Sequence, residues 1–473
     1  MKRFVSILLM LCLCLGLLAC GTSGGATETT EAKATFKAGF GKVVITPTEP
    51  VPLASYGDDR DRISTGRFTE LEARAVAIQD ENGDIMVFAV GDVTWCPADL
   101  APKILKEVEK KYGVPADHVV LSGTHTHASV STSLTDFPSV VNFNKKYVSG
   151  MTDAIGQAID DLKPAEVYTG SAITENMNFV RRYIMDDGSL IGDNAYGTGE
   201  YIVKHETEAD AEMQLLKFVR EGGNDIVIAN FQSHPHLEGK TTNLSAQNVG
   251  AFRDAVESEM GIHCLYWQGA SGNLNSSSRI EGETRTKDRN EYGKLLAGYV
   301  AKEYDNLTKV ETGPIKVTTT TFTGKVNKIY NDKVDDAKLV KEYFKAGHTP
   351  AETAEYAWQF GINSYYHANR IVNNFQLPET KDMDLTAFSF GEIAGIIVPY
   401  EMFDTNGMEV KTGSPFTRTF IISYSYPSYS GYIPSALGYE NGGYESDNST
   451  YAPGTGEELV AAYLGMLNEL KGK

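Results

Sequence analysis

The chain has 473 residues, of which 41% are apolar and 10% are aromatic, so it can bury a large core and is neither disordered nor collagen-like. Its 62 acidic residues outnumber its 43 basic residues, which gives a net charge of −19 at pH 7. This balance excludes binding to nucleic acid and docking on anionic lipid through a basic face, because both need clustered lysine and arginine.

The first 19 residues have the pattern of an export signal. A short basic start is followed by an unbroken apolar run that is too short for a comfortable membrane span. The run ends in Leu-Leu-Ala-Cys, which resembles a bacterial lipobox, so we expect residues 1–19 to be a lipoprotein signal peptide and Cys20 to be lipidated. An ordinary signal peptide with a chance cysteine is the alternative. Residues 20–35 are small and polar and predict a flexible tether. Residues 36–473 would then form one large extracytoplasmic domain, held at the cell membrane only by its lipid anchor.

The first half of this domain alternates predicted strands with predicted helices. Two apolar segments within Leu71–Val93 are joined by Glu81-Asn82-Gly83, and Asn-Gly is a strong hairpin signal. Residues 97–112 have helical periodicity, and residues 118–123 predict a short buried strand. A strand, a helix and a strand within about 40 residues predict a βαβ unit and a partly parallel sheet.

Later segments extend this pattern. Further strands are expected at residues 165–173, 211–219, 225–232, 263–267 and 385–398, with helices over 250–260 and 456–470. Residues 332–374 predict a helical pair, because Gly347 can end one helix and Thr349-Pro350-Ala351-Glu352 can begin another with an N-cap, Pro at N1 and Glu at N3. We therefore expect an α/β fold with mixed, partly parallel sheets flanked by helices in a single large domain.

Cysteine usage indicates little covalent cross-linking. Only Cys96 and Cys264 lie beyond the expected signal peptide and lipidation site, and two cysteines form neither a disulfide framework nor a Cys-type zinc site. Both lie beside apolar segments, so two buried thiols are expected, with a single disulfide as the alternative.

Four of the nine histidines fall in two pairs, and each pair follows a predicted strand. Thr-His-Thr-His holds His125 and His127, and Ser-His-Pro-His holds His234 and His236. In extended backbone, residues two apart point to the same side, and open α/β sheets bind ligands beyond the carboxyl ends of their strands. The pairs therefore predict a metal or catalytic site. Glu401 follows another apolar segment and could add the carboxylate that a hydrolytic zinc site often uses, although a surface carboxylate is the alternative.

The segments that carry these residues resemble, in order, those of the N-terminal catalytic domain of the neutral/alkaline ceramidases. SGTHTHAS is similar to the family's SGTHTHSG, and NFQSHPH to its FAVHPT. VPYEMFDTNG resembles the family's PGE segment, SGYIPS its segment with a metal-binding tyrosine, and GGYESDNSTYAPG its YE-x-x-ST block. The resemblance covers about residues 37–460 and implies an acyl-amide hydrolase.

The resemblance also implies roles for particular residues. One Zn²⁺ would be held by four ligands, which are His125, His234, Glu401 and Tyr432. His127 would face the substrate carbonyl, and Tyr444 aligns with the tyrosine of the last block. Either Arg181 or Arg182 aligns with a segment near the substrate, with a surface ion pair as the alternative.

One departure from the family concerns the nucleophile. The family's Gly-Asp-Val-Ser-Pro-Asn segment contains an essential serine, whereas the matching residues 272–277 place Asn275 at the serine position and Asn273 at the acidic position. We therefore expect water activated by the metal to attack the carbonyl directly, with His127 stabilising the oxyanion and Asn275 orienting the carbonyl. We also expect no C-terminal immunoglobulin-like domain of the kind that long family members append.

Three other functions stay open at this point. The chain could hydrolyse a different amide or an ester, or it could be a non-catalytic lipoprotein that binds a ligand, or its histidines could be structural. An enzyme is favoured because a pure binder has no need to keep the four implied ligands together. The sequence does not specify the acyl chain, the amine or the oligomeric state. A group of late tyrosines could line an aromatic cleft or simply pack together: Tyr424, Tyr426, Tyr429, Tyr432, Tyr439 and Tyr444.

Overall fold

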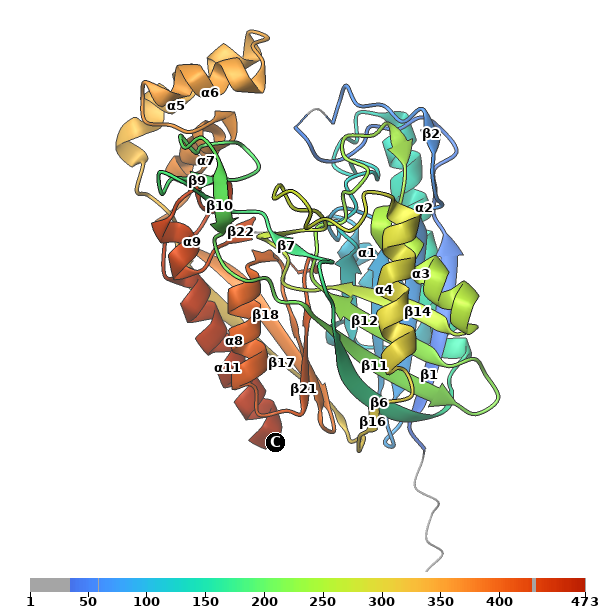
Figure 1. Ribbon diagram of the computed structural model, residues 1–473. Coiled ribbons are helices and arrows are strands. Elements are labelled where there is room, and N and C mark those ends of the chain that lie inside the picture. The colour runs from blue at the N-terminus through green and yellow to red at the C-terminus, as the bar shows by residue number, and fades with distance from the viewer. Residues whose placement is uncertain (1–34, 58, 428–430, 473) are drawn as a thin grey trace, which may run out of the picture. The chain divides into compact units, whose positions relative to one another are not determined.

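A computed structural model of the chain describes residues 35–57, 59–427 and 431–472 (Figure 1). The predicted signal peptide, Cys20 and nearly all of the predicted tether lie outside these residues. Within the described ranges, no helix is both long enough and apolar enough to cross a membrane.

A nine-stranded sheet forms the larger half of the fold. In order across the sheet its strands are β14 (His263–Gln268), β12 (Ile226–Phe231), β11 (Glu212–Arg220), β6 (Lys163–Ile173), β1 (Lys37–Val44), β3 (Glu72–Gln79), β4 (Ile85–Gly91) and β5 (Val119–Gly123), with β16 (Thr308–Lys309) paired to β6. Neighbours are antiparallel except β4–β5 and β12–β14. Helices α1 (Ala101–Tyr112) and α3 (Gln247–Met260) connect these parallel pairs. The predicted βαβ unit is confirmed, and a second one occurs at the other end of the sheet.

The strands that lead to the two histidine pairs are well separated in this sheet. β5 is one edge and β12 is next to the other edge, so their ends would be far apart if the sheet were flat. The two halves instead face each other across one core, in which Phe88 of β4 packs against Trp267 of β14 with ring centroids 5.0 Å apart. This packing brings the ends of β5 and β12 together.

Helices cover the outer faces of the sheet. α1 and α2 (Pro138–Asp160) pack on the half that contains β3 and β4. α3 and α4 (Arg289–Glu303) pack on the half that contains β11, β12 and β14. α2 has 23 residues and was not expected from the sequence.

A smaller sheet carries the C-terminal part of the chain. Its order is β17 (Ile315–Lys325), β18 (Thr380–Phe390), β19 (Ile393–Ile397) and β21 (Arg418–Ile422). The last two strands are parallel and are connected by α8 (Asp404–Gly413), while α11 (Thr455–Gly472) packs beside them. The expected final helix is thus confirmed, and the expected strand region is a hairpin of β18 and β19. β17 was not expected, because its middle residues are exposed threonines.

The predicted helical pair is wrong in number, because three helices occupy this segment. They are α5 (Val334–Lys345), α6 (Pro350–Trp358) and α7 (Tyr365–Gln376). The capping box that begins α6 at Thr349 and Glu352 is present as expected. The segment after Thr349 forms two helices rather than one, because Gly361 has a φ of 64° between them and Ser364 caps the start of α7.

Short elements complete the fold, and several of them surround the histidines. They are β2 (Gly66–Arg67), β7 (Phe179–Val180), β8 (Tyr183–Met185), β9 (Leu190–Ile191), β10 (Ile202–His205), β13 (Asn243–Leu244), β15 (Leu274–Asn275), β20 (Glu401–Met402), β22 (Tyr432–Ile433), α9 (Ala436–Glu440) and α10 (Tyr444–Asp447). Cys96 and Cys264 are both buried and free, which confirms two separate thiols.

Candidate metal centre

His125 reaches the site from a strained turn rather than from extended backbone. β5 ends at Gly123, and His125 has a φ of 65°, in the left-handed region that non-glycine residues rarely occupy. The expectation of two histidines on one side of an extended segment is therefore wrong in its geometry. The turn is fixed by the His125 amide, which donates to the Val93 carbonyl at 3.1 Å. Such strain is typical of functional sites.

Backbone carbonyls orient two of the imidazoles. His125 Nδ1 lies 2.9 Å from the Thr94 carbonyl oxygen. His234 Nδ1 lies 2.9 Å from the Ser271 carbonyl and 3.0 Å from the Leu274 carbonyl. A carbonyl only accepts hydrogen bonds, so Nδ1 carries the proton in both rings and Nε2 presents a lone pair.

Both lone pairs point toward the carboxyl group of Glu401. His234 Nε2 lies 3.2 Å from Glu401 Oε2, and His125 Nε2 lies 3.7 Å from the same oxygen. His127 Nε2 is 3.1 Å from His125 Nε2. Ligands of a tetrahedral zinc are about 3.3 Å apart, given bonds of about 2.0–2.1 Å. The spacing of these four groups therefore fits a divalent cation among them.

Burial supports the same interpretation. His125 is 2% exposed and His234 is fully buried, and His234 Nε2 has no hydrogen-bond partner in the part of the chain that the structure describes. Such an unpaired buried atom is costly unless a ligand occupies it. The ligand atoms of His125, His127 and His234 all lie within 4.8 Å of one another. These residues fit a metal ion.

The protonation of the histidines suits metal binding. Burial lowers the pKa of His125 to about 3 and holds the pKa values of His127 and His234 well below their usual range, with the nearby Arg181 acting in the same direction. The imidazoles are therefore neutral, which is the form that binds metals. Burial also raises the pKa of Glu401 to about 8, and the guanidinium of Arg181 opposes that shift.

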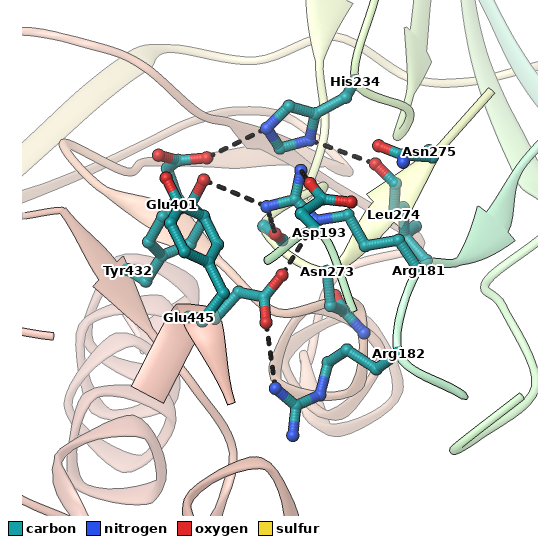
Figure 2. Close-up of polar contacts among 12 residues, drawn as sticks. Arg181, Arg182, Asp193, His234, Asn273, Leu274, Asn275, Glu401, Tyr432 and Glu445 are labelled. Atoms are coloured by element: carbon teal, nitrogen blue, oxygen red, sulfur yellow. Dashed lines mark hydrogen bonds and ion pairs between the residues drawn. The ribbon is translucent and has the colours of Figure 1, made fainter. Parts of the chain in front are cut away.

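Glu401 and Tyr432 are neighbours because their short strands pair. β20 and β22 are parallel, with Glu401 opposite Tyr432. Arg181 Nη2 also donates to the Tyr432 hydroxyl at 3.0 Å (Figure 2). Burial raises the pKa of Tyr432 well above its usual range, while Arg181 lowers it.

The structure separates the roles of the two adjacent arginines. Arg181 donates to Tyr432 and to Glu445 at 2.9 Å, and it forms an ion pair with Asp193 at 3.0 Å. Arg182 pairs with the other oxygen of Glu445, at 2.9 Å, and with Glu206. Figure 2 shows Arg182 beyond Glu445 from Tyr432. Arg181 is therefore the arginine of the site, and both arginines are buried rather than surface-exposed.

Other predicted residues lie around this centre. The ring of Tyr444 is 5.6 Å from that of Tyr432, measured between centroids. Asn275 Oδ1 lies 3.0 Å from His236 Nε2, and the ring of His236 stacks on His127 with centroids 5.2 Å apart. Asn275 is thus held against the second histidine pair.

The neighbouring polar residues have other partners. Asn273 is a structural residue that donates to Asp404 at 2.7 Å. Ser271 Oγ accepts from Gln268 and lies 2.9 Å from the Tyr424 hydroxyl. Ser276 Oγ donates to the His234 carbonyl at 3.2 Å.

Sequence reasoning did not identify several side chains at the centre. Tyr424 stacks on His125 with centroids 3.8 Å apart, and Trp95 packs edge-on to the same ring at 5.3 Å. Asp193, which binds Arg181, lies in a segment without a recognisable motif. Tyr424 could have been singled out from the tyrosine-rich segment, whereas Trp95 and Asp193 carry no signal of their own.

Comparison with known proteins identifies relatives of this chain. The family model described as "Neutral/alkaline non-lysosomal ceramidase, N-terminal" matches residues 36–278. The neutral ceramidase of Drosophila pseudoobscura pseudoobscura is 25% identical over 240 residues, which cover 48% of this chain and 33% of that protein. Neutral ceramidase 2 of Arabidopsis thaliana is 26% identical over 227 residues, or 45% of this chain and 28% of that protein. The chain thus matches about a third of the length of these curated relatives.

Solved structures share the fold over a longer span. The neutral ceramidase from Pseudomonas aeruginosa superposes with a TM-score of 0.69 and 17% identity, covering 92% of this chain and 75% of that one. A ceramidase complexed with C2 gives a TM-score of 0.70 and 17% identity, covering 93% and 76%. This likeness confirms the mixed α/β fold class. The family model includes both histidine pairs, whereas Glu401 and Tyr432 lie beyond its last matched residue.

Proposed function

The chain belongs to the neutral/alkaline non-lysosomal ceramidase family, and from this membership we propose that it is a zinc-dependent hydrolase of acyl amides. The observation that carries the proposal is the convergence of His125 and His234 on Glu401 in a buried site, where their Nε2 atoms lie 3.7 and 3.2 Å from the same carboxylate oxygen. N-acylsphingosine is the first substrate to test.

The residues that would hold one zinc ion are His125, His234, Glu401 and Tyr432. When bound, the ion would polarise the amide carbonyl and lower the pKa of a water molecule. Arg181 supports Tyr432 in this role, since a guanidinium 3.0 Å from the hydroxyl stabilises the phenolate over the phenol.

The other side chains of the site would act on the substrate. His127 lies beside His125 and would donate to the oxygen of the tetrahedral intermediate. Asn275 would orient the carbonyl through its amide, which His236 holds at 3.0 Å. Tyr444 would line the substrate side of Tyr432. Arg181 would also add positive charge near the developing oxyanion.

The nearby serines support attack by water rather than by a serine. An activated serine needs a base within hydrogen-bond reach. Ser271 instead contacts Gln268 and Tyr424, and Ser276 donates to a backbone carbonyl. Asn275 itself can neither attack nor relay a proton.

We place the enzyme outside the cell, anchored by lipid on Cys20, on the evidence of its lipobox-like sequence alone. The substrate would then be an extracytoplasmic acyl amide.

The test compares the wild type with His234→Ala. Zinc content and release of fatty acid from N-acylsphingosine and from short-chain acyl amides would be measured on both proteins. We expect zinc and turnover in the wild type, and loss of both with the fold retained in the variant. Tight retention of a ligand without any turnover would contradict the proposal and would favour a binding lipoprotein.

A further inference from the structure

Another pocket of the structure is mostly apolar. It has a volume of about 300 Å³ and is formed by residues of α5, α6 and α7 and by Asn194 and Ala195. Most of its lining is apolar or aromatic, including Phe344, Ala354 and Trp358, and Glu355 is its one charged lining residue. This size and lining suit an alkyl chain.

Aromatic rings connect this pocket to the metal centre. The ring of Tyr432 lies 5.6 Å from that of Tyr444, and the ring of Tyr444 lies 5.9 Å from that of Tyr366, measured between centroids. Tyr366 also lines the pocket. Asn194, which also lines the pocket, follows Asp193 in the chain, and Asp193 pairs with Arg181 at 3.0 Å. Two residues that line the pocket, Tyr366 and Asn194, are therefore direct neighbours of residues of the site.

The exposure of Trp358 is the evidence that an apolar ligand binds in this pocket. Its side chain is 52% exposed, although tryptophan is a large apolar residue that proteins usually cover. An apolar chain in the pocket would remove part of this ring from water, and burial of apolar surface favours binding.

We propose that this pocket binds the acyl chain of the substrate, at the end remote from the scissile amide. The proposal rests on the proposed function for the identity of the substrate. A short acyl group such as acetyl is too short to extend from Tyr432 past Tyr444 to Tyr366, which are separated by ring distances of 5.6 and 5.9 Å. A long acyl chain reaches Tyr366 and the pocket that it lines. The enzyme would therefore select acyl amides by chain length.

A larger cavity is the alternative position for the chain. It has a volume of about 1060 Å³, runs between α1 and α2, and borders Thr94 and Trp95. Six charged side chains line it: Asp59, Asp99, Lys103, Glu107, Lys111 and Lys145. Charged groups lose hydration when an alkyl chain covers them, so this cavity is the poorer site for an acyl chain.

The first test measures binding without turnover. N-acyl amides with a small polar amine, in which the acyl chain is the one apolar group, would be titrated into the His234→Ala protein while tryptophan fluorescence is recorded. We expect a blue shift that appears only with long chains and that is lost in a second protein carrying Trp358→Phe as well. Absence of any shift at every chain length would overturn the proposal, even if the wild type proved inactive.

The second test uses a matched pair of substitutions in the active protein. Ala354→Phe fills the pocket, whereas Ala346→Phe adds the same ring at an exposed position that does not line it. We expect Ala354→Phe to raise KM for long-chain substrates by about tenfold or more, the effect of excluding two methylene groups, and to leave acetyl substrates and kcat unchanged. The control should behave as the wild type. If Val148→Trp in the larger cavity changes the chain-length dependence and Ala354→Phe does not, the assignment is wrong.

Discussion

Two substitutions distinguish the metal ligands from the neighbouring donor. Tyr432 and His127 both lie beside the group formed by His125, His234 and Glu401, and either could supply a fourth ligand atom. We expect Tyr432→Phe to weaken zinc binding and His127→Ala to leave it nearly unchanged. The reason is that Tyr432 is registered opposite Glu401 and is supported by Arg181, whereas no carbonyl or carboxylate fixes the ring of His127 in the part of the chain that the structure describes.

The magnitudes follow from these roles. Structural zinc sites contribute an apparent 10–16 kcal/mol, so one of four ligands is worth about 3 kcal/mol and its loss should weaken binding by about 10²–10³-fold. His127→Ala should instead lower kcat by about 10²–10³-fold, which is the usual effect of removing one donor to an oxyanion.

The assay is a competition for zinc against a chelator of known affinity, followed by kinetics on zinc-saturated protein. Circular dichroism of each variant would show that the fold is retained. Loss of zinc in His127→Ala together with full zinc binding in Tyr432→Phe would refute this assignment and would make the three histidines the ligand set.

Three further predictions concern stability and location. Glu445→Gln should lower the free energy of unfolding, measured by urea denaturation, by about 2–3 kcal/mol. The loss should not be larger, because Arg181 retains its ion pair with Asp193 and Arg182 retains its ion pair with Glu206. An unchanged free energy of unfolding would mean that the buried network is not formed. Burial raises the pKa of Asp447 to about 7, so the folded protein binds this proton more tightly than the unfolded chain does. The free energy of unfolding that this proton contributes should be present at pH 4 and be lost as the pH rises through 7. Urea midpoints measured from pH 5 to 8 should fall in the wild type and fall less in Asp447→Asn; equal slopes would contradict this. Cys20→Ser should move the protein from the membrane fraction to the soluble fraction, and a wild type that is soluble without detergent would disprove lipidation.

The sequence predicted the strands that carry the histidines, because their apolar segments are short, buried and bounded by clear turn signals. It could not show how the strands meet. β5 and β12 lie at nearly opposite ends of one sheet, and only the packing of its two halves across Phe88 and Trp267 brings His125 close to His234. Long-range packing of this kind has no local signature.

The sequence identified a site residue most readily where that residue belongs to a distinctive local motif. His125 and His234 stand in pairs, whereas Glu401 resembles any carboxylate after a strand, and its neighbour Tyr432 is adjacent only through the pairing of β20 with β22. Asp193 contributes a single ion pair to Arg181 from an irregular segment. β17 was hidden for a similar reason, since its exposed threonines lack the apolar alternation of a half-buried strand.

The most direct measurement of the central claim is the metal itself. The purified full-length protein would be crystallised, and anomalous diffraction would be recorded on both sides of the zinc absorption edge, with zinc content determined on the same sample. We predict one zinc per chain, with its anomalous peak bonded to His125, His234 and Glu401. A protein that hydrolyses acyl amides with no metal at this position, or with its zinc bound elsewhere, would contradict the account.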